Sequence, residues 1–228
     1  MGVIAKEAYV RAESFCGPEA LGKAICYCID AGDLQSAEQI NMSFKNPVYV
    51  IGGTAPQYRD SQDLITVVSQ KEQGITDFSN ERPVLATFGL GPCIALTGYD
   101  SDRRAGFLTH YDSKVDLSGS LDSLFNSLPH DTFFDFDVSI IGGDFLSASV
   151  YLELKSLLSS LDSPSIKLSV SEEDVFGEFN RSVALDTRTG RRFVYRPDPS
   201  KYFELRFPDY NIVKCTAETI CNSFAKHE

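Results

Sequence analysis

The sequence predicts an α/β protein, in which helices and a mixed β-sheet form a layered sandwich. Along residues 83–197, short apolar segments typical of strands are interspersed with amphipathic segments typical of helices. Several apolar segments stop at glycine-containing turns, and two of them flank a Thr-Gly dipeptide, as in a β-hairpin. The hydrophobic fraction of 43% and the charged fraction of 23% are ordinary for a protein with a packed core.

Residues 1–82 are predicted to be a helix-rich N-terminal extension packed on the core. Pro18 suits the first turn of a helix, and Gly32 suits the position after its end. The apolar residues between them follow the spacing of a buried helical stripe: Leu21, Ile25, Cys28 and Ile29. A short strand is expected at residues 48–51 (VYVI), where two glycines stop it. Residues 54–82 are polar, and their structure stays open.

Residues 83–197 form the predicted core. Strands are expected in four apolar segments: 84–88, 105–110, 138–141 and 166–170. Residues 93–99 (CIALTGY) could form a strand or a short buried helix, because periodicity does not distinguish the two. Two helices are expected, one that carries Leu121–Leu128 and ends at Pro129, and one over residues 150–161. Residues 182–186 and 192–195 are expected to pair as a hairpin.

Residues 198–228 are predicted to be a C-terminal tail that follows two prolines, Pro197 and Pro199. Within the tail we expect a strand at residues 202–207 and a helix at about 216–224.

Charge and hydropathy exclude several classes of partner. The net charge is −11, so a nucleic-acid backbone or an anionic membrane surface would repel the chain. No apolar run approaches the roughly 18 residues that span a bilayer, so membrane insertion is not expected. The first residues lack the basic and apolar stretches of a cleavable signal peptide. The expected location is the cytoplasm, or outside the cell after export without such a peptide.

The cysteines do not form a metal-binding pattern. There are six of them, with spacings that do not suit a zinc site: Cys16, Cys26, Cys28, Cys93, Cys215 and Cys221. The chain contains three histidines, and free thiols are the default where no signal peptide is visible. No metal and no organic cofactor is therefore expected.

Three core residues are candidates for catalysis: Thr87, Cys93 and His110. A cysteine nucleophile acts as a thiolate, so we expect a nearby imidazole or backbone dipoles to lower the pKa of Cys93. The preceding turn at residues 89–92 (GLGP) lets backbone N–H groups approach a developing oxyanion, although Pro92 has none. His110 ends the next strand, where a strand-turn-strand excursion can bring it beside Cys93. Thr87 can fix the tautomer of His110 by a hydrogen bond.

The sequence is also compatible with a purely structural role for these residues. A cysteine that begins an apolar run often packs as a small hydrophobe, and a histidine at a strand end is often solvated. His130 and His227 are expected to be solvated, which leaves His110 as the best imidazole for Cys93.

At these residues the sequence resembles the CheD family of chemoreceptor glutamine deamidases. Residues 87–93 (TFGLGPC) are similar to the family's Thr followed by a Leu-Gly-Ser-Cys turn, and residues 105–110 (AGFLTH) to its Gly-Gly-x-x-His strand. The spacings of six and seventeen residues agree with the family. Residues 140–143 (IIGG), 176–178 (FGE) and 182–191 (SVALDTRTGR) continue the resemblance, which covers about half of the chain.

The resemblance implies an α/β/α sandwich with a mixed sheet, related to toxins of the cytotoxic necrotizing factor type. It also implies a core domain at residues 83–197 that deamidates glutamine in a protein substrate. Two departures stand out: Pro92 replaces the Ser before the cysteine, and residues 111–113 (YDS) replace an apolar-Pro segment. Because residues 1–82 and the tail have no counterpart in the family, a bacterial effector or toxin with another target is expected.

The predicted function is hydrolysis of a glutamine side-chain amide, with Cys93 as nucleophile, His110 as general base and Thr87 orienting the imidazole. Substrate and oxyanion contacts are expected from four residues near the cysteine: Gly89, Gly91, Pro92 and Tyr111. The expected partner is a protein with an exposed Gln, and the same residues suit transglutamination or proteolysis equally well. The alternative is a non-enzymatic protein-binding module that keeps the fold.

Overall fold

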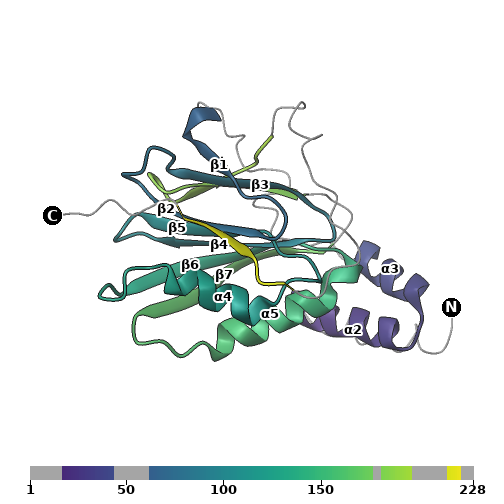
Figure 1. Ribbon diagram of the computed structural model, residues 1–228. Coiled ribbons are helices and arrows are strands. Elements are labelled where there is room, and N and C mark those ends of the chain that lie inside the picture. The colour runs from purple at the N-terminus through teal and green to yellow at the C-terminus, as the bar shows by residue number, and fades with distance from the viewer. Residues whose placement is uncertain (1–16, 44–61, 177–180, 197–214, 222–228) are drawn as a thin grey trace.

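The computed structural model describes residues 17–43, 62–176, 181–196 and 215–221, and they form two β-sheets and four α-helices (Figure 1). The helices are α2 (Pro18–Asp30), α3 (Leu34–Ser43), α4 (Leu117–Asn126) and α5 (Ala148–Ser160), with single 3₁₀ turns at Gln62–Leu64 and Phe145–Ser147. An α/β fold with mixed sheets is thus confirmed.

The smaller sheet has the strand order β1-β3-β8-β9, formed by β1 (Ile65–Val67), β3 (Val84–Leu90), β8 (Arg181–Asp186) and β9 (Arg191–Phe193). β1 is parallel to β3, and the other pairs are antiparallel. A bulge between Phe88 and Leu90 interrupts the pairing of β3 with β8, and Gly89 there has a φ of 80°. This irregular end of β3 leads directly into the turn before Cys93.

The larger sheet has the order β10-β2-β5-β4-β6-β7. Its strands are β2 (Glu72–Asp77), β4 (Ile94–Asp100), β5 (Ala105–Thr109), β6 (Phe134–Gly142), β7 (Ile166–Val175) and β10 (Glu218–Cys221). The outer pairs β10–β2 and β6–β7 are parallel, and the central pairs are antiparallel. Cys93 immediately precedes β4, and His110 immediately follows β5, so both lie at the same end of two paired strands.

The molecule is layered as sheet, sheet and helices. The largest core joins one face of the six-stranded sheet to all four helices, with Phe107 and Phe136 from the sheet and Ile25 and Leu154 from the helices. A second core lies between the two sheets and includes Leu85, Leu108 and Val183. This order differs from the α/β/α order implied by the resemblance, because the four-stranded sheet covers the face opposite the described helices (Figure 1).

Strand alternation explains which side chains meet between the sheets. On β3, Leu85 and Thr87 point toward the six-stranded sheet, whereas Val84, Ala86 and Phe88 join an apolar cluster on the outer face. On the six-stranded sheet, Ala95 and Leu108 belong to the inter-sheet core, whereas Ile94 and Phe107 belong to the helix-facing core.

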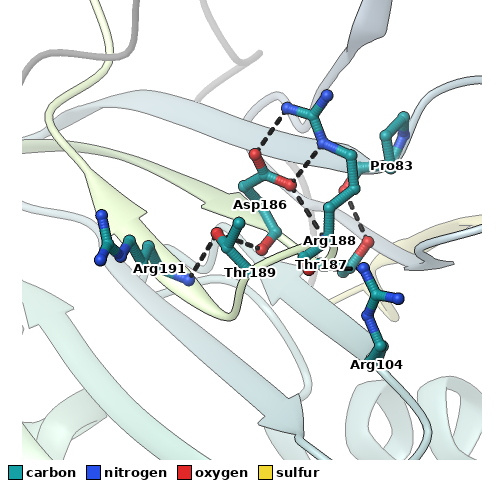
Figure 2. A network of polar contacts seen from close by, with 7 residues as sticks. All are labelled: Pro83, Arg104, Asp186, Thr187, Arg188, Thr189 and Arg191. Atoms are coloured by element: carbon teal, nitrogen blue, oxygen red, sulfur yellow. Dashed lines mark hydrogen bonds and ion pairs between the residues drawn. The ribbon is translucent and has the colours of Figure 1, made fainter.

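A polar network fixes the β8–β9 hairpin (Figure 2). The hairpin lies beside the start of β3, whereas the turn before Cys93 follows the end of β3. Asp186 binds the guanidinium of Arg188 through both carboxylate oxygens, at 2.9 and 2.6 Å. Thr187 donates a hydrogen bond to the carbonyl of Pro83, and Arg104 donates one to the carbonyl of Arg188. Because Arg104 belongs to the β4–β5 turn, this last bond joins the two sheets at the hairpin end.

Most of the predicted core elements are confirmed, and of residues 93–99 all but Cys93 belong to strand β4. The helix expected at about 216–224 is wrong: residues 218–221 form β10, parallel to β2, because the β-branched Thr219 and Ile220 suit a strand. Residues 65–67 and 72–77, in the segment that stayed open, are strands of the two sheets. The expected strands at 48–51 and 202–207 lie outside the described residues. Among the described helices, none is long and apolar enough to cross a membrane.

Candidate active site

The site centres on a hydrogen bond between the two sheets. Thr87 of β3 and His110, at the end of β5, are both buried, and Thr87 Oγ1 lies 2.7 Å from His110 Nδ1. This is the contact expected from the sequence. The other ring nitrogen, Nε2, is buried and has no hydrogen-bond partner among the described residues. Since buried polar atoms are nearly always paired, this nitrogen requires an explanation, and a catalytic role is one of those that apply.

Cys93 lies on the same sheet face as His110. Ile94 and Tyr111 form an antiparallel bridge, with N–H to O distances of 2.9 and 2.8 Å in the two directions. Extending this register by one residue each way pairs Ala95 with His110 and Cys93 with Asp112. Cys93 and His110 are therefore diagonal neighbours, and such pairs have Cα atoms about 7–8 Å apart in a regular sheet. The structure thus places the two side chains on one face, but Cys93 Sγ makes no hydrogen bond to His110 Nε2.

Burial controls the chemistry of the sulfur. Cys93 is 5% exposed and belongs to the inter-sheet core, with Leu90, Ala95 and Ile141 among its members. Burial raises the pKa of the Cys93 thiol to about 12, and the negative charges of Asp112 and Asp144 add to the rise. The lowered thiol pKa expected from the sequence is therefore wrong for this conformation, because desolvation outweighs any stabilisation of the thiolate.

Burial has the opposite effect on His110, which is 3% exposed. Loss of solvation lowers the pKa of His110 to about 4, although Asp112 and a backbone hydrogen bond with Val68 act to raise it. At neutral pH the pair is therefore a thiol and a neutral imidazole. If Nδ1–H donates to Thr87, the lone pair of Nε2 is free to accept a proton.

We expect NMR titration of the His110 ring to give a pKa near 4. The folded pKa lies below that of the unfolded chain, near 6.5, so the unfolded state binds more protons between these values. The free energy of unfolding should therefore fall as the pH drops from about 6.5 to 4, by an amount on the order of 3 kcal/mol. A His110→Gln variant should lose this part of the pH dependence, and a measured pKa above 6 in the wild type would contradict the burial.

The backbone around Cys93 offers one N–H group for an oxyanion. The Cys93 carbonyl accepts a hydrogen bond from Gly143 N–H at 2.8 Å, whereas the Cys93 N–H donates to no other described residue. In the preceding turn, Gly91 is half-buried and Pro92 is exposed, so the turn lies at the surface beside the sulfur. A free N–H next to the nucleophile is the element that an oxyanion hole needs.

Tyr111 does not take part in this arrangement. Its side chain is fully buried in the helix-facing core, and its hydroxyl donates to Gln73 Oε1 at 2.6 Å. The expected substrate contact is thus wrong, because the residue after His110 in an extended chain points to the opposite face.

Asp112 was not among the predicted site residues, although the same alternation could have found it. It is two residues beyond His110 and therefore on the same face. Its Oδ2 accepts a hydrogen bond from Gln70 Nε2 at 2.9 Å and lies 3.9 Å from Lys71 Nζ. The segment that carries Gln70 and Lys71 connects β1 to β2, so it passes from one sheet to the other beside the site.

Among the described residues, no group of three or more His, Cys, Asp or Glu is placed so that it could hold a metal ion. In comparisons with known proteins, no family model and no curated protein matches the chain.

Proposed function

We propose that the protein hydrolyses the side-chain carboxamide of glutamine in a protein substrate, with Cys93, His110 and Thr87 as the reacting and orienting groups. The observation that carries the proposal is the Thr87–His110 hydrogen bond, which leaves Nε2 unpartnered on the sheet face of Cys93. The resemblance of residues 87–93 and 105–110 to glutamine deamidases supports it independently.

The reaction proceeds through a thioester. His110 Nε2 takes the thiol proton while Cys93 Sγ attacks the amide carbon, and the Cys93 N–H stabilises the oxyanion. The C–N bond then breaks, and His110 returns the proton to the departing ammonia. Water attacks the thioester with His110 again as base, the C–S bond breaks, and the thiol regains its proton. The net change is Gln plus water to Glu plus ammonia.

The neutral resting pair determines how the proton moves. A thiol with a pKa of about 12 is not ionised at neutral pH, so proton transfer accompanies the attack on the amide. General-base assistance of this kind contributes about 10²–10⁴-fold to a rate. The proposed activity requires a neutral His110, so it should decline only below a pH near 4.

The test uses benzyloxycarbonyl-glutaminyl-glycine and a mixture of unrelated proteins as substrates. The proposal predicts ammonia release from wild-type protein and a mass increase of about 1 Da at modified glutamines, as amide-to-acid exchange requires. Incorporation of an added amine would instead indicate transglutamination, and cleaved main chain would indicate proteolysis. No change in either substrate, at any pH from 5 to 9, would contradict the proposal.

One observation favours the alternative function, a protein-binding module that retains the fold. Cys93 is packed among aliphatic side chains, and its pKa is raised, as in a structural cysteine. Alkylation by iodoacetamide at neutral pH separates the two functions. A glutamine peptide that occupies the proposed site covers the sulfur, so it should slow alkylation of Cys93 and leave that of Cys26 unchanged. Equal rates with and without the peptide would favour the binding module.

A further inference from the structure

Asp112 faces both members of the proposed reacting pair. Continuing the Ile94–Tyr111 bridge by one residue places Asp112 directly opposite Cys93, in a non-hydrogen-bonded pair whose Cα atoms are about 4.5 Å apart in a regular ladder. His110 lies two residues before it on the same face. The charge of Asp112 acts on both neighbours, since it raises the pKa of Cys93 and of His110.

Hydrogen bonds hold the Asp112 carboxylate in place but do not use all of its acceptor positions. Oδ1 accepts a hydrogen bond from the N–H of Lys114 at 2.8 Å, and Oδ2 accepts the one from Gln70. Lys71 Nζ, 3.9 Å away, is at the outer limit of an ion pair and compensates part of the charge. A carboxylate has about four acceptor positions, so capacity for a further donor remains. Asp112 is 9% exposed, more than Cys93 or His110.

We propose that Asp112 is the residue that selects a carboxamide over a carboxylate, by accepting a hydrogen bond from the –NH₂ group of the bound glutamine. The inference rests on the proposed function and deepens it. An amide with its carbonyl oxygen at the Cys93 N–H directs its –NH₂ group toward the side of His110 and Asp112. There the amide offers two N–H donors, and one carboxylate acceptor meets one of them.

The Asp112 carboxylate also disfavours binding of the glutamate product. After hydrolysis the –NH₂ group is replaced by a second oxygen, so two negative charges face one another in a partly buried site. This repulsion favours product release and disfavours binding of glutamate side chains. A site discriminates strongly against a ligand that leaves one of its buried polar groups without a hydrogen-bond partner.

Asp144 supplies a matched control. It also raises the pKa of the Cys93 thiol, but its charge is not among those that act on His110. Its carboxylate caps the 3₁₀ turn at Phe145–Ser147 by accepting a hydrogen bond from Leu146 N–H, a role that Asn also performs. Asp144→Asn therefore removes a negative charge near the Cys93 sulfur and leaves the Asp112 carboxylate unchanged.

The experiment measures binding without turnover. The protein used is the chain with the Cys93→Ala substitution. NMR titration gives its dissociation constants for benzyloxycarbonyl-glutaminyl-glycine and for benzyloxycarbonyl-glutamyl-glycine. We expect the glutamine peptide to bind at least about tenfold more tightly. Asp112→Asn should remove this preference, because a neutral Asn amide can accept from a carboxamide and can also donate to a carboxylate, whereas Asp144→Asn should retain it. Lys71→Gln removes the compensating cation and should increase the preference, which keeps the test decisive if Asp112→Asn does not fold.

The outcomes distinguish this inference from the proposed function. Three results would overturn the role of Asp112. They are an unchanged preference in folded Asp112→Asn, an unchanged or smaller preference in Lys71→Gln, and no binding of either peptide. Ammonia release by the wild-type chain is measured in parallel. Turnover without a preference that depends on Asp112 contradicts only the inference, whereas a preference without turnover contradicts only the proposed function.

Discussion

Replacing Cys93 by Ser is expected to reduce ammonia release from a glutamine substrate by about 10³-fold or more. A serine hydroxyl is a far poorer nucleophile than a thiol in a site built around sulfur, and removal of a nucleophile typically eliminates most of the rate enhancement. His110→Gln should reduce the rate by about 10²–10⁴-fold, because it removes the proton acceptor. Steady-state ammonia release at pH 7 measures both effects.

Cys26→Ser is the matched control for the nucleophile. Cys26 is a half-buried free thiol on α2, in the helix layer on the opposite side of the six-stranded sheet from Cys93. Its replacement should leave the rate within about twofold, as for a surface substitution away from the site. If Cys93→Ser retained more than a tenth of the wild-type rate, Cys93 would not be the nucleophile.

Arg181→Leu is expected to lower the free energy of unfolding by about 3–5 kcal/mol, because it leaves a buried carboxylate without its cation. Arg181 Nε lies 2.9 Å from Asp174 Oδ1, and both side chains are almost completely buried. Arg181 also donates to the carbonyl of Phe176 at 2.6 Å. For a chain of this length the loss corresponds to a melting temperature lower by roughly 6–20 °C.

The double variant Asp174→Leu/Arg181→Leu separates loss of the ion pair from loss of packing. Since two apolar groups can replace a buried pair at little cost, the double variant should be more stable than the single Arg181→Leu variant. Chemical denaturation of Arg181→Leu, Asp174→Leu and the double variant gives the three free energies that the comparison needs. If the two single effects simply added, the ion pair would not be the source of the destabilisation.

This ion pair also bears on the site. Asp174 belongs to β7 of the larger sheet, and Arg181 begins β8 of the smaller one, where it pairs with Leu90. Leu90 is the last residue of β3 before the turn that leads to Cys93. The bond therefore ties the two sheets together at the end that carries the candidate site, as the Arg104 contact does at the other end.

Local sequence patterns were sufficient to predict much of the fold. Turn residues and apolar periodicity placed β3, β5, α5 and the hairpin around Thr189-Gly190 close to their observed bounds. At 218–221 the β-branched Thr219 and Ile220 favour a strand, but the strand forms by pairing with β2, about 146 residues earlier in the chain, and local pattern does not show that pairing. The layer order was missed for the same reason: the amphipathic pattern shows that a face is buried but not which element covers it.

For the site, too, the sequence predicted some features and not others. Spacing placed Thr87 and His110 within reach of each other, and the 2.7 Å contact agrees with this. Sequence reasoning did not anticipate the sign of the Cys93 pKa shift, because the degree of burial depends on how the second sheet packs over β4. It also selected Tyr111 in place of Asp112, although alternation along an extended strand distinguishes the two.

The most direct test of the central claim is covalent labelling with a diazoketone analogue of glutamine, followed by peptide mass spectrometry. Such a reagent presents its electrophilic carbon where a nucleophile would attack the amide. We predict one adduct per chain, on Cys93, formed much more slowly in His110→Gln protein. An adduct on another cysteine, or none on Cys93 while the glutamine dipeptide is being hydrolysed, would contradict the assignment.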